Sequence, residues 1–375
     1  MRATRSLAAL LGAAMLVPLA GIGATAQSPS AATAPLDASD PVIAELIAAT
    51  QTEGAINSYG MPDDWTNFGE IFANFTTLYG APGTPLTHTD TDMSSAEEIS
   101  KMDAEKNNPV ADIGDIGILF GPIAVSNGVA GCYKPTVWDQ IPDYAKDPNG
   151  CWNGWYQGTI SFAVNPDATG GFVPRTWEDL KNPALAGKVA ISDPIAAAQG
   201  QFAVLAAAFA HGGDETNIQP GIDFFQQLND AGNLSPLAPT QANLEKGEIG
   251  VGIVWDYIAL PMRDELAGVA PIEVVIPSDG TTSAPYVALL NTYGAHPNAA
   301  KLLLEYVLSD EGQIIQAKKY ARPIRDEVVL PADIAAAFPP AEAYAAVKPV
   351  TDWVQAATIG PSLAESWTIP VGQDS

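Results

Sequence analysis

Near the middle of the 375-residue chain lies the stretch WNGWYQGTISFAVNP, residues Trp152 to Pro166. From Gly158 to Val164 it consists mostly of residues that favour β structure, and Asn165-Pro166 ends the run. Trp152, Trp155 and Tyr156 lie at its entrance. The segments on both sides show α/β patterns. We therefore expect this strand to carry the chain from one lobe to another, with the aromatic residues marking a cleft between them.

Helices and strands alternate before this stretch. The periodicity predicts helices over 40–53, 65–79 and 92–106, and strands over 55–60, 85–89 and 110–117. Asp40, Asp64 and Ser94 are candidate N-caps, and Ser94 with Glu97, or Ser95 with Glu98, fits a capping box. This alternation is typical of a parallel sheet covered by helices.

The pattern resumes after the central stretch with a second set of elements. Strands are predicted over 188–194, 249–254, 272–276 and 285–290, and helices over 176–180, 196–210, 222–228, 298–306 and 310–320, with another following Trp255. The strand at 285–290 is placed to return the chain to the first lobe. We expect lobe 1 to comprise 36–159 plus 285–325 and lobe 2 to comprise 160–284. The alanine- and proline-rich segment 326–375 is expected to be partly helical and to pack on the lobes.

The N-terminus has the three parts of a secretory signal. Arg2 and Arg5 precede an apolar run, and Ala24-Thr25-Ala26 is a small-residue cleavage site. We expect a signal peptide over 1–26 and a linker over 27–35. Because no cysteine lies near the site and no later apolar run is long enough to span a bilayer, we expect an exported, soluble, periplasmic monomer without a lipid anchor.

The chain is strongly acidic. Its formal net charge is −26, and loss of the two signal-peptide arginines would make it more negative still. Such a surface repels phosphate backbones, so nucleic acid is not an expected partner. Solubility is the simplest explanation of the charge, and attraction of cationic ligands is the alternative.

Cys132 and Cys151 are the only cysteines of the chain. In an oxidising compartment an isolated pair predicts a disulfide, here closing a Pro/Asp/Asn/Gly-rich loop. Two free buried thiols are the alternative. A metal site is poorly supported, because no histidine or further cysteine lies nearby.

Catalytic motifs are missing from the sequence. There is no G-x-S-x-G, S-x-x-K, H-E-x-x-H or phosphate-binding G-x-x-x-x-G-K-[ST] pattern. The three histidines, His88, His211 and His296, are scattered. We therefore expect a protein that is not an enzyme and that has no cofactor and no metal centre.

Polar and aromatic residues gather where predicted strands end, which is where open α/β sheets bind ligands. The candidate ligand-binding residues are Ser58, Tyr59, Asp92, Ser94, Asp115, Trp155, Tyr156, Asp193, Gln199, Trp255, Asp256 and Tyr286. Structural alternatives exist for several of them: Ser94 as a helix cap, Asp193 as a helix start, and Trp155 and Trp255 as core residues. Tyr156 and Asp256 are favoured as cleft residues because they follow strands rather than lie within apolar runs.

Several short segments together resemble a known family. They are 158–166, 174–180 (PRTWEDL), 187–194 (GKVAISDP), 244–251 (LEKGEIGV), and 296–301 (HPNAAK) through 308–313 (LSDEGQ). In this order and spacing, over nearly all of the chain after the signal, they resemble a type II extracellular solute-binding protein of an ABC importer. The similarity is closest to the branch of iron, polyamine and thiamine binders.

The resemblance implies two α/β lobes joined by crossing strands, hinge closure on a small-molecule ligand, and delivery to permease subunits. Iron binders of this family use an adjacent tyrosine pair, which this chain lacks. Carboxylates such as Asp92, Asp115, Asp193 and Asp256, with the aromatic candidates, suit a polyamine-like cation. The alternatives are an organic anion at the helix starts near Ser94 or Ala196, a ferric ion, an exported enzyme on the same scaffold, or a signalling receptor subunit.

Overall fold

The computed structural model describes residues 36–372. The predicted signal peptide and linker lie outside the described residues. Within the described part, none of the helices is both long and apolar enough to span a membrane.

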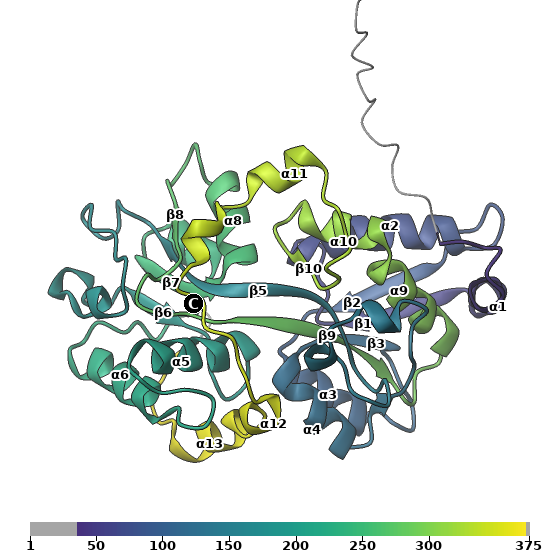
Figure 1. The fold of residues 1–375 in the computed structure, drawn as a ribbon, viewed down its shortest axis with the longest axis horizontal. Helices are drawn as coiled ribbons and strands as arrows, with labels where there is room; N and C mark the ends of the chain where they lie inside the picture. Colours follow the sequence, from purple (N-terminus) through teal and green to yellow (C-terminus); the bar gives the residue numbers. More distant parts are fainter. Residues whose placement is uncertain (1–35, 373–375) are drawn as a thin grey trace, which may run out of the picture. The chain divides into compact units, whose positions relative to one another are not determined.

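Strand β5, Asn153–Val164, is the element that both halves of the fold share. It begins five residues before the predicted strand and so includes Trp155 and Tyr156. Its first half pairs antiparallel with β9, Ser283–Asn291. Its second half, from Ile160 to Val164, pairs antiparallel with β7, Val251–Trp255. The long strand β5 therefore links two groups of strands (Figure 1).

The first group of strands, with its helices, forms what we call the first lobe. The strand order is β2-β1-β3-β9, in which β1, Ala55–Tyr59, pairs parallel with both neighbours and β9 runs antiparallel to β3. The other main elements of this lobe are β2 Thr87–Thr91, β3 Ile113–Gly117, α1 Pro41–Glu53, α2 Phe68–Tyr79, α3 Ser95–Ala104, α4 Gly121–Ser126, α9 Pro297–Leu308 and α10 Asp310–Ala317. The predicted cap of α1 is confirmed, because the Asp40 carboxylate accepts from the backbone N–H groups of Val42 and Ile43.

The helix predicted over 65–79 is not continuous. A 3₁₀ turn, η1, occupies Trp65–Asn67, and α2 starts only at Phe68. Thr66 and Asn67 both have positive φ, a conformation that is costly for residues other than glycine. The predicted cap Asp64 makes no side-chain cap hydrogen bond. Because of this break, the side chain of Trp65 does not take the direction that a continuous helix over 65–79 would give it.

The second lobe is built on the far half of β5, with strand order β5-β7-β6 and β8 pairing β5. Its main elements are β6 Val189–Ile191, β7, β8 Glu273–Val275, α5 Ala198–Ala210, α6 Gln219–Asp230, α7 Gln241–Glu245 and α8 Asp256–Glu265. Helix α5 is apolar on nearly every face and is buried along almost its whole length. The helix predicted over 176–180 is a 3₁₀ helix, η5, at Glu178–Lys181. The lobe boundaries proposed from the sequence stay a prediction.

The C-terminal segment is partly helical, as predicted. Its elements are α11 Ala332–Ala337, η7 Ala341–Tyr344, α12 Trp353–Ala356 and α13 Ile359–Ser366. Figure 1 shows α11 above β5, whereas α12 and α13 lie beside α5. Trp353 stacks on Tyr144, with ring centroids 5.8 Å apart, and also packs against Phe202 of α5. The segment therefore contacts residues from both sides of β5.

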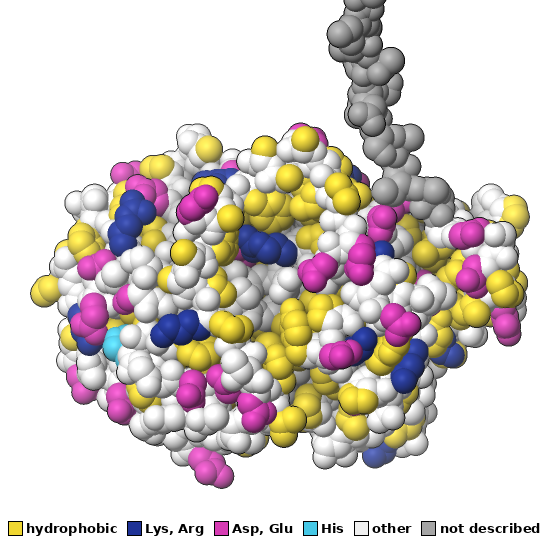
Figure 2. Space-filling view, in the orientation of Figure 1, with side chains coloured by type: hydrophobic (Ala, Val, Ile, Leu, Met, Phe, Trp, Pro, Cys, Tyr) yellow, Lys and Arg dark blue, Asp and Glu magenta, His cyan; other side chains and the backbone are white. Residues whose placement is uncertain are grey.

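The disulfide between Cys132 and Cys151 is confirmed. It closes the loop that leads into β5, and in the chain-entropy account such a link stabilises the fold by about 3 kcal/mol. Asp and Glu side chains are spread over the visible face of the molecule, with Lys and Arg interspersed (Figure 2).

Candidate functional site: a cleft lined by carboxyl groups

Two adjoining cavities form one cleft. The smaller, about 180 Å³, is here called the inner chamber, and the larger, about 740 Å³, the outer chamber. Trp65, Asp92, Ser94, Ser192 and Gln199 line both. The first three belong to the first lobe and the last two to the second, so the cleft is built by both lobes.

The starts of helices α3 and α5 meet at this cleft. The backbone N–H of Ala96 donates to the carbonyl of Ala196, at 3.4 Å. The predicted capping box of Ser94 and Glu97 is present at the start of α3. The backbone N–H and the hydroxyl of Ser94 both donate to the Glu97 carboxylate. The two helix starts thus contact each other across the cleft.

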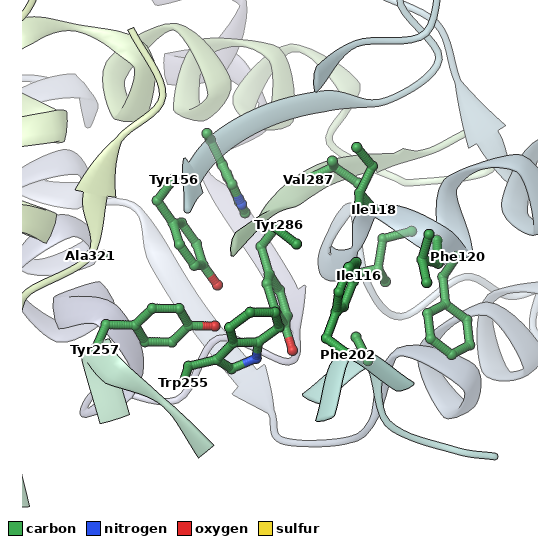
Figure 3. Packing of buried hydrophobic residues seen from close by; sticks show 14 of the residues in the cluster. Ile116, Ile118, Phe120, Tyr156, Phe202, Trp255, Tyr257, Tyr286, Val287 and Ala321 are labelled. Atoms are coloured by element: carbon green, nitrogen blue, oxygen red, sulfur yellow. The ribbon is translucent and has the colours of Figure 1, made fainter. Parts of the chain in front are cut away.

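Aromatic rings form the base of the cleft. Trp65 packs edge-on against Tyr257 and Tyr286, with ring centroids 5.5 and 5.6 Å apart. Tyr156 stacks on Tyr286 at 5.5 Å and meets Tyr257 edge-on. Figure 3 shows the rings of Tyr156, Tyr257 and Tyr286 converging, with Trp255 beside them. These residues come from η1, β5, β7, α8 and β9, so the cluster connects both lobes.

Asp115, in the middle of β3, contacts this cluster. Its carboxylate accepts from the indole N–H of Trp65 and of Trp155, each at 2.8 Å, and from the Tyr156 hydroxyl. Burial raises the pKa of Asp115 from 3.8 to about 7, although these hydrogen bonds oppose the shift. Asp115 is thus a buried acid whose hydrogen-bonding capacity is largely used within the protein.

Glu98 is the second buried acid of the inner chamber. Its side chain is on α3, and its Oε2 accepts the backbone N–H of Asp115 at 3.0 Å. Among the described residues, Oε1 has no hydrogen-bond partner. Burial, and after it the neighbouring Asp115 charge, raise the pKa of Glu98 well above its usual range.

Seven carboxyl side chains line the two chambers, and no Lys, Arg or His is found among the described lining residues. The seven are Asp64, Asp92, Glu97, Glu98, Asp115, Asp193 and Glu265. Several side-chain donors of the cleft are already used within the protein: Trp65 donates to Asp115, and Gln199 Nε2 donates to Ser192 Oγ at 2.8 Å. The cleft therefore offers a ligand mainly negative charge, hydrogen-bond acceptors and aromatic faces.

The structure brings half of the sequence-predicted site residues to the cleft lining. These six are Asp92, Ser94, Asp115, Asp193, Gln199 and Tyr286. Trp155, Tyr156 and Trp255 are buried behind the lining, in contact with Asp115 or with the lining tyrosines.

Three predicted residues lie elsewhere. The hydroxyl of Ser58 donates to Asp90 and that of Tyr59 to Glu105, each at 2.6 Å, and neither residue lines the chambers. Asp256 is fully buried and accepts from Arg322 Nη1, at 2.5 Å, and from the hydroxyl of Tyr344, at 2.9 Å. Its charge is thus neutralised within the protein, and it is not brought to the cleft.

Three further lining residues are not among the sequence-predicted site residues. The sequence predicts Trp65 within a regular helix and Glu98 within a capping box. Tyr257 lies in the helix predicted after Trp255, and it lines the outer chamber. The only local indication that Trp65 belongs to a site is that it directly follows two acids, Asp63 and Asp64. The backbone break that directs its side chain inward has no clear sequence signature.

The fold and the two-lobe cleft define the class of two-lobe binding proteins for small solutes. Within that class the chain belongs to the bacterial extracellular solute-binding protein family, whose family model matches residues 108–353. The resemblance proposed from the sequence is confirmed at this level.

Two curated relatives match part of the chain. A functionally uncharacterised protein of Haemophilus influenzae is 31% identical over 240 residues, covering 60% of this chain and 66% of that protein. A thiosulfate-binding protein of Pseudomonas aeruginosa is 27% identical over 188 residues, covering 48% of this chain and 54% of that protein. The matches thus span just under two thirds and about half of these relatives.

Solved structures with the same fold include proteins described for different ligands. The periplasmic binding protein AfuA of Actinobacillus pleuropneumoniae, with fructose-6-phosphate, has a TM-score of 0.68 at 21% identity, covering 83% of this chain and 98% of that one. Iron-bound HitA of Pseudomonas aeruginosa has a TM-score of 0.65 at 18% identity, covering 84% and 99%. A putative spermidine/putrescine ABC transporter protein of Listeria monocytogenes has a TM-score of 0.63 at 14% identity, covering 83% of this chain and 98% of that one. These likenesses show the fold and leave the ligand open.

Proposed function

We propose that this chain is the exported, periplasmic solute-binding component of an ABC importer and that it captures a small, polyamine-like organic cation. The observation that carries the proposal is the set of seven carboxyl groups lining a cleft whose described lining has no basic side chain. Like charges held close together destabilise one another, and a bound cation relieves that repulsion.

The aromatic base of the cleft supports the same ligand class. The faces of Trp65, Tyr257 and Tyr286 suit methylene groups and ammonium cations, which are attracted to aromatic rings. An ammonium group taken from water also needs carboxylate partners, and the cleft supplies them.

An anionic ligand such as thiosulfate or a sugar phosphate is less well matched. It would enter a cleft of seven carboxyl groups with only helix N-termini to offset its charge. A ferric ion is disfavoured as well: no group of three or more His, Cys, Asp or Glu side chains in the described residues is arranged to hold a metal.

Capture by closure follows from the two-lobe lining. A ligand that contacts Asp92 and Trp65 on one lobe and Gln199 and Tyr257 on the other stabilises the closed form over the open form. The closed complex would then be the form recognised by the permease, and the ligand would leave chemically unchanged.

Isothermal titration calorimetry on the exported protein tests the proposal. The probes are 1,4-diaminobutane, spermidine, thiosulfate, fructose-6-phosphate and ferric citrate, each followed by a thermal melt, since a ligand specific for the folded state raises the melting temperature. We expect micromolar or tighter binding of at least one of the two amines, with mass spectrometry showing the amine unchanged. Binding of an anion or of ferric citrate with no binding of either amine would overturn the proposal.

A further inference from the structure

We propose that Glu98 selects ligands whose cationic nitrogen carries hydrogen, so that primary and secondary ammonium groups enter the inner chamber and fully methylated ammonium groups do not. The inference rests on the proposed function and identifies the residue that would set its specificity. Negative charge and aromatic faces attract both kinds of cation, so a separate feature is needed to tell them apart.

The feature is an unfilled hydrogen-bond acceptor. Glu98 is only 1% exposed, and its Oε1 has no hydrogen-bond partner among the described residues. A buried acceptor without a donor has lost its hydrogen bonds to water and gained none in return, which is unfavourable. A ligand N–H that reaches Oε1 removes this cost, whereas a methyl group leaves it in place.

The surroundings of Glu98 reserve space for its carboxyl group. Its oxygens lie so close to Gly60 and Gly114 that a Cβ at either position would clash with them. Gly60 also lines the inner chamber, so the side of Glu98 that carries Oε1 lies next to a chamber-lining residue. The absence of side chains at Gly60 and Gly114 therefore leaves room for the Glu98 carboxyl group at the wall of the inner chamber.

The neighbouring acid cannot take this role equally well. Asp115 already accepts from Trp65, Trp155 and Tyr156, whereas Glu98 accepts only one backbone N–H. Of the two buried acids, Glu98 and Asp115, it is therefore Glu98 that has more room to accept further hydrogen bonds. A donor that enters the inner chamber finds its open partner there.

The sizes of the two chambers suggest how a linear diamine would lie. The inner chamber, at about 180 Å³, suits one ammonium end with a few methylene groups. The second ammonium would then reach the outer chamber, where Asp64, Asp193 and Glu265 supply carboxylates. Glu98 would thus read one end of the ligand while the outer acids hold the other.

The experiment compares 1,4-diaminobutane with 1,4-bis(trimethylammonio)butane, which has the same charge and spacing but no N–H. Calorimetry is done on the parent protein, on Glu98→Gln and on Asp63→Asn, a control that removes an exposed acid lining neither chamber. We expect the parent to bind the diamine at least tenfold more tightly than its methylated analogue. Glu98→Gln should lose this preference, and Asp63→Asn should keep it.

The outcomes separate the inference from the proposed function. If the parent binds both dications equally, or if Glu98→Gln keeps the parent's preference, the role of Glu98 is refuted while cation binding stands. If the parent binds neither of these dications nor spermidine, cation capture itself fails. Glu98→Asp is the second variant, in case the glutamine variant melts early: it keeps the carboxyl group but shortens the side chain, and it should weaken diamine binding more than binding of the analogue.

Discussion

Asp256, the first residue of α8, forms a buried ion pair with Arg322 of β10, a short strand at Arg322–Pro323 that pairs with β5. The Asp256 side chain is fully buried, and it also accepts the backbone N–H of Thr159 at 2.9 Å. Arg322 is covered by the ring of Tyr344, 4.3 Å from its centroid. The ion pair thus joins the start of α8 to β5 and to the C-terminal segment.

Replacement of Asp256 by alanine should reduce stability rather than ligand affinity. It leaves Arg322 and Tyr344 without their partner, and breaking a buried pair of this kind costs about 3 kcal/mol. Chemical denaturation and calorimetry measure the two quantities. Asp167→Ala, an exposed acid of the same lobe, is the control and should change neither. A parent-like melting temperature together with lost affinity would place Asp256 in the cleft after all.

Replacement of Trp65 by alanine should weaken cation binding at least tenfold, because it removes an aromatic wall shared by both chambers. Trp65→Phe keeps a ring but loses the N–H that Asp115 accepts, so a smaller loss is expected. Trp138→Ala, in the loop closed by the disulfide, is the control. Unchanged affinity in Trp65→Ala would exclude the proposed aromatic base from ligand recognition.

The stability of the ligand-free protein should depend on pH through Asp115. Its pKa is raised from 3.8 to about 7 by burial, so between these values the folded state holds a proton that the unfolded state has lost. Stability contributed by the protonated form is therefore complete below about pH 4 and is lost as the pH rises to about 7.

Melting curves from pH 4 to 8 on the parent and on Asp115→Asn measure this effect. The variant should be less stable overall, because an amide cannot accept from all three donors, but its melting temperature should fall less steeply with pH. An identical slope in both proteins would show that Asp115 is ionised throughout this range.

Removal of the disulfide by Cys132→Ser with Cys151→Ser should cost about 3 kcal/mol of stability, following loop-closure entropy. Ligand affinity at low temperature should stay within a few-fold of the parent, because neither cysteine lines the chambers. Guanidinium denaturation and calorimetry provide the two readings. A large loss of affinity would mean that the loop before β5 shapes the cleft.

Regular periodicity made most of the fold predictable. The strands around Ile56, Ile191 and Ile253 and the helices around Phe72, Leu205 and Leu303 follow from apolar spacing, which depends only on near neighbours in the chain. The position of Trp65 does not follow in this way. It depends on two residues with positive φ that the local sequence does not require.

The site was predictable only in part, for a related reason. Asp92 directly follows β2 and Asp115 lies within β3, and the topology brings both to the cleft. Asp256 also directly follows a strand, but its partner Arg322 is distant in sequence, and nothing near Asp256 indicates the pairing. Glu98 fits a capping box in the sequence, and its buried position depends on room left by Gly60 and Gly114, which are distant in sequence.

The path of residues 367–372 has a practical consequence for the placement of labels. Trp367, Ile369 and Val371 are largely buried, and Gly372 packs against Asp193 at the edge of the outer chamber. A fluorophore or affinity tag attached just beyond Gly372 would therefore stand at the ligand's entrance and could block it. Sensors built from this protein should instead carry their reporter on a surface remote from this edge, such as the exposed positions of α1.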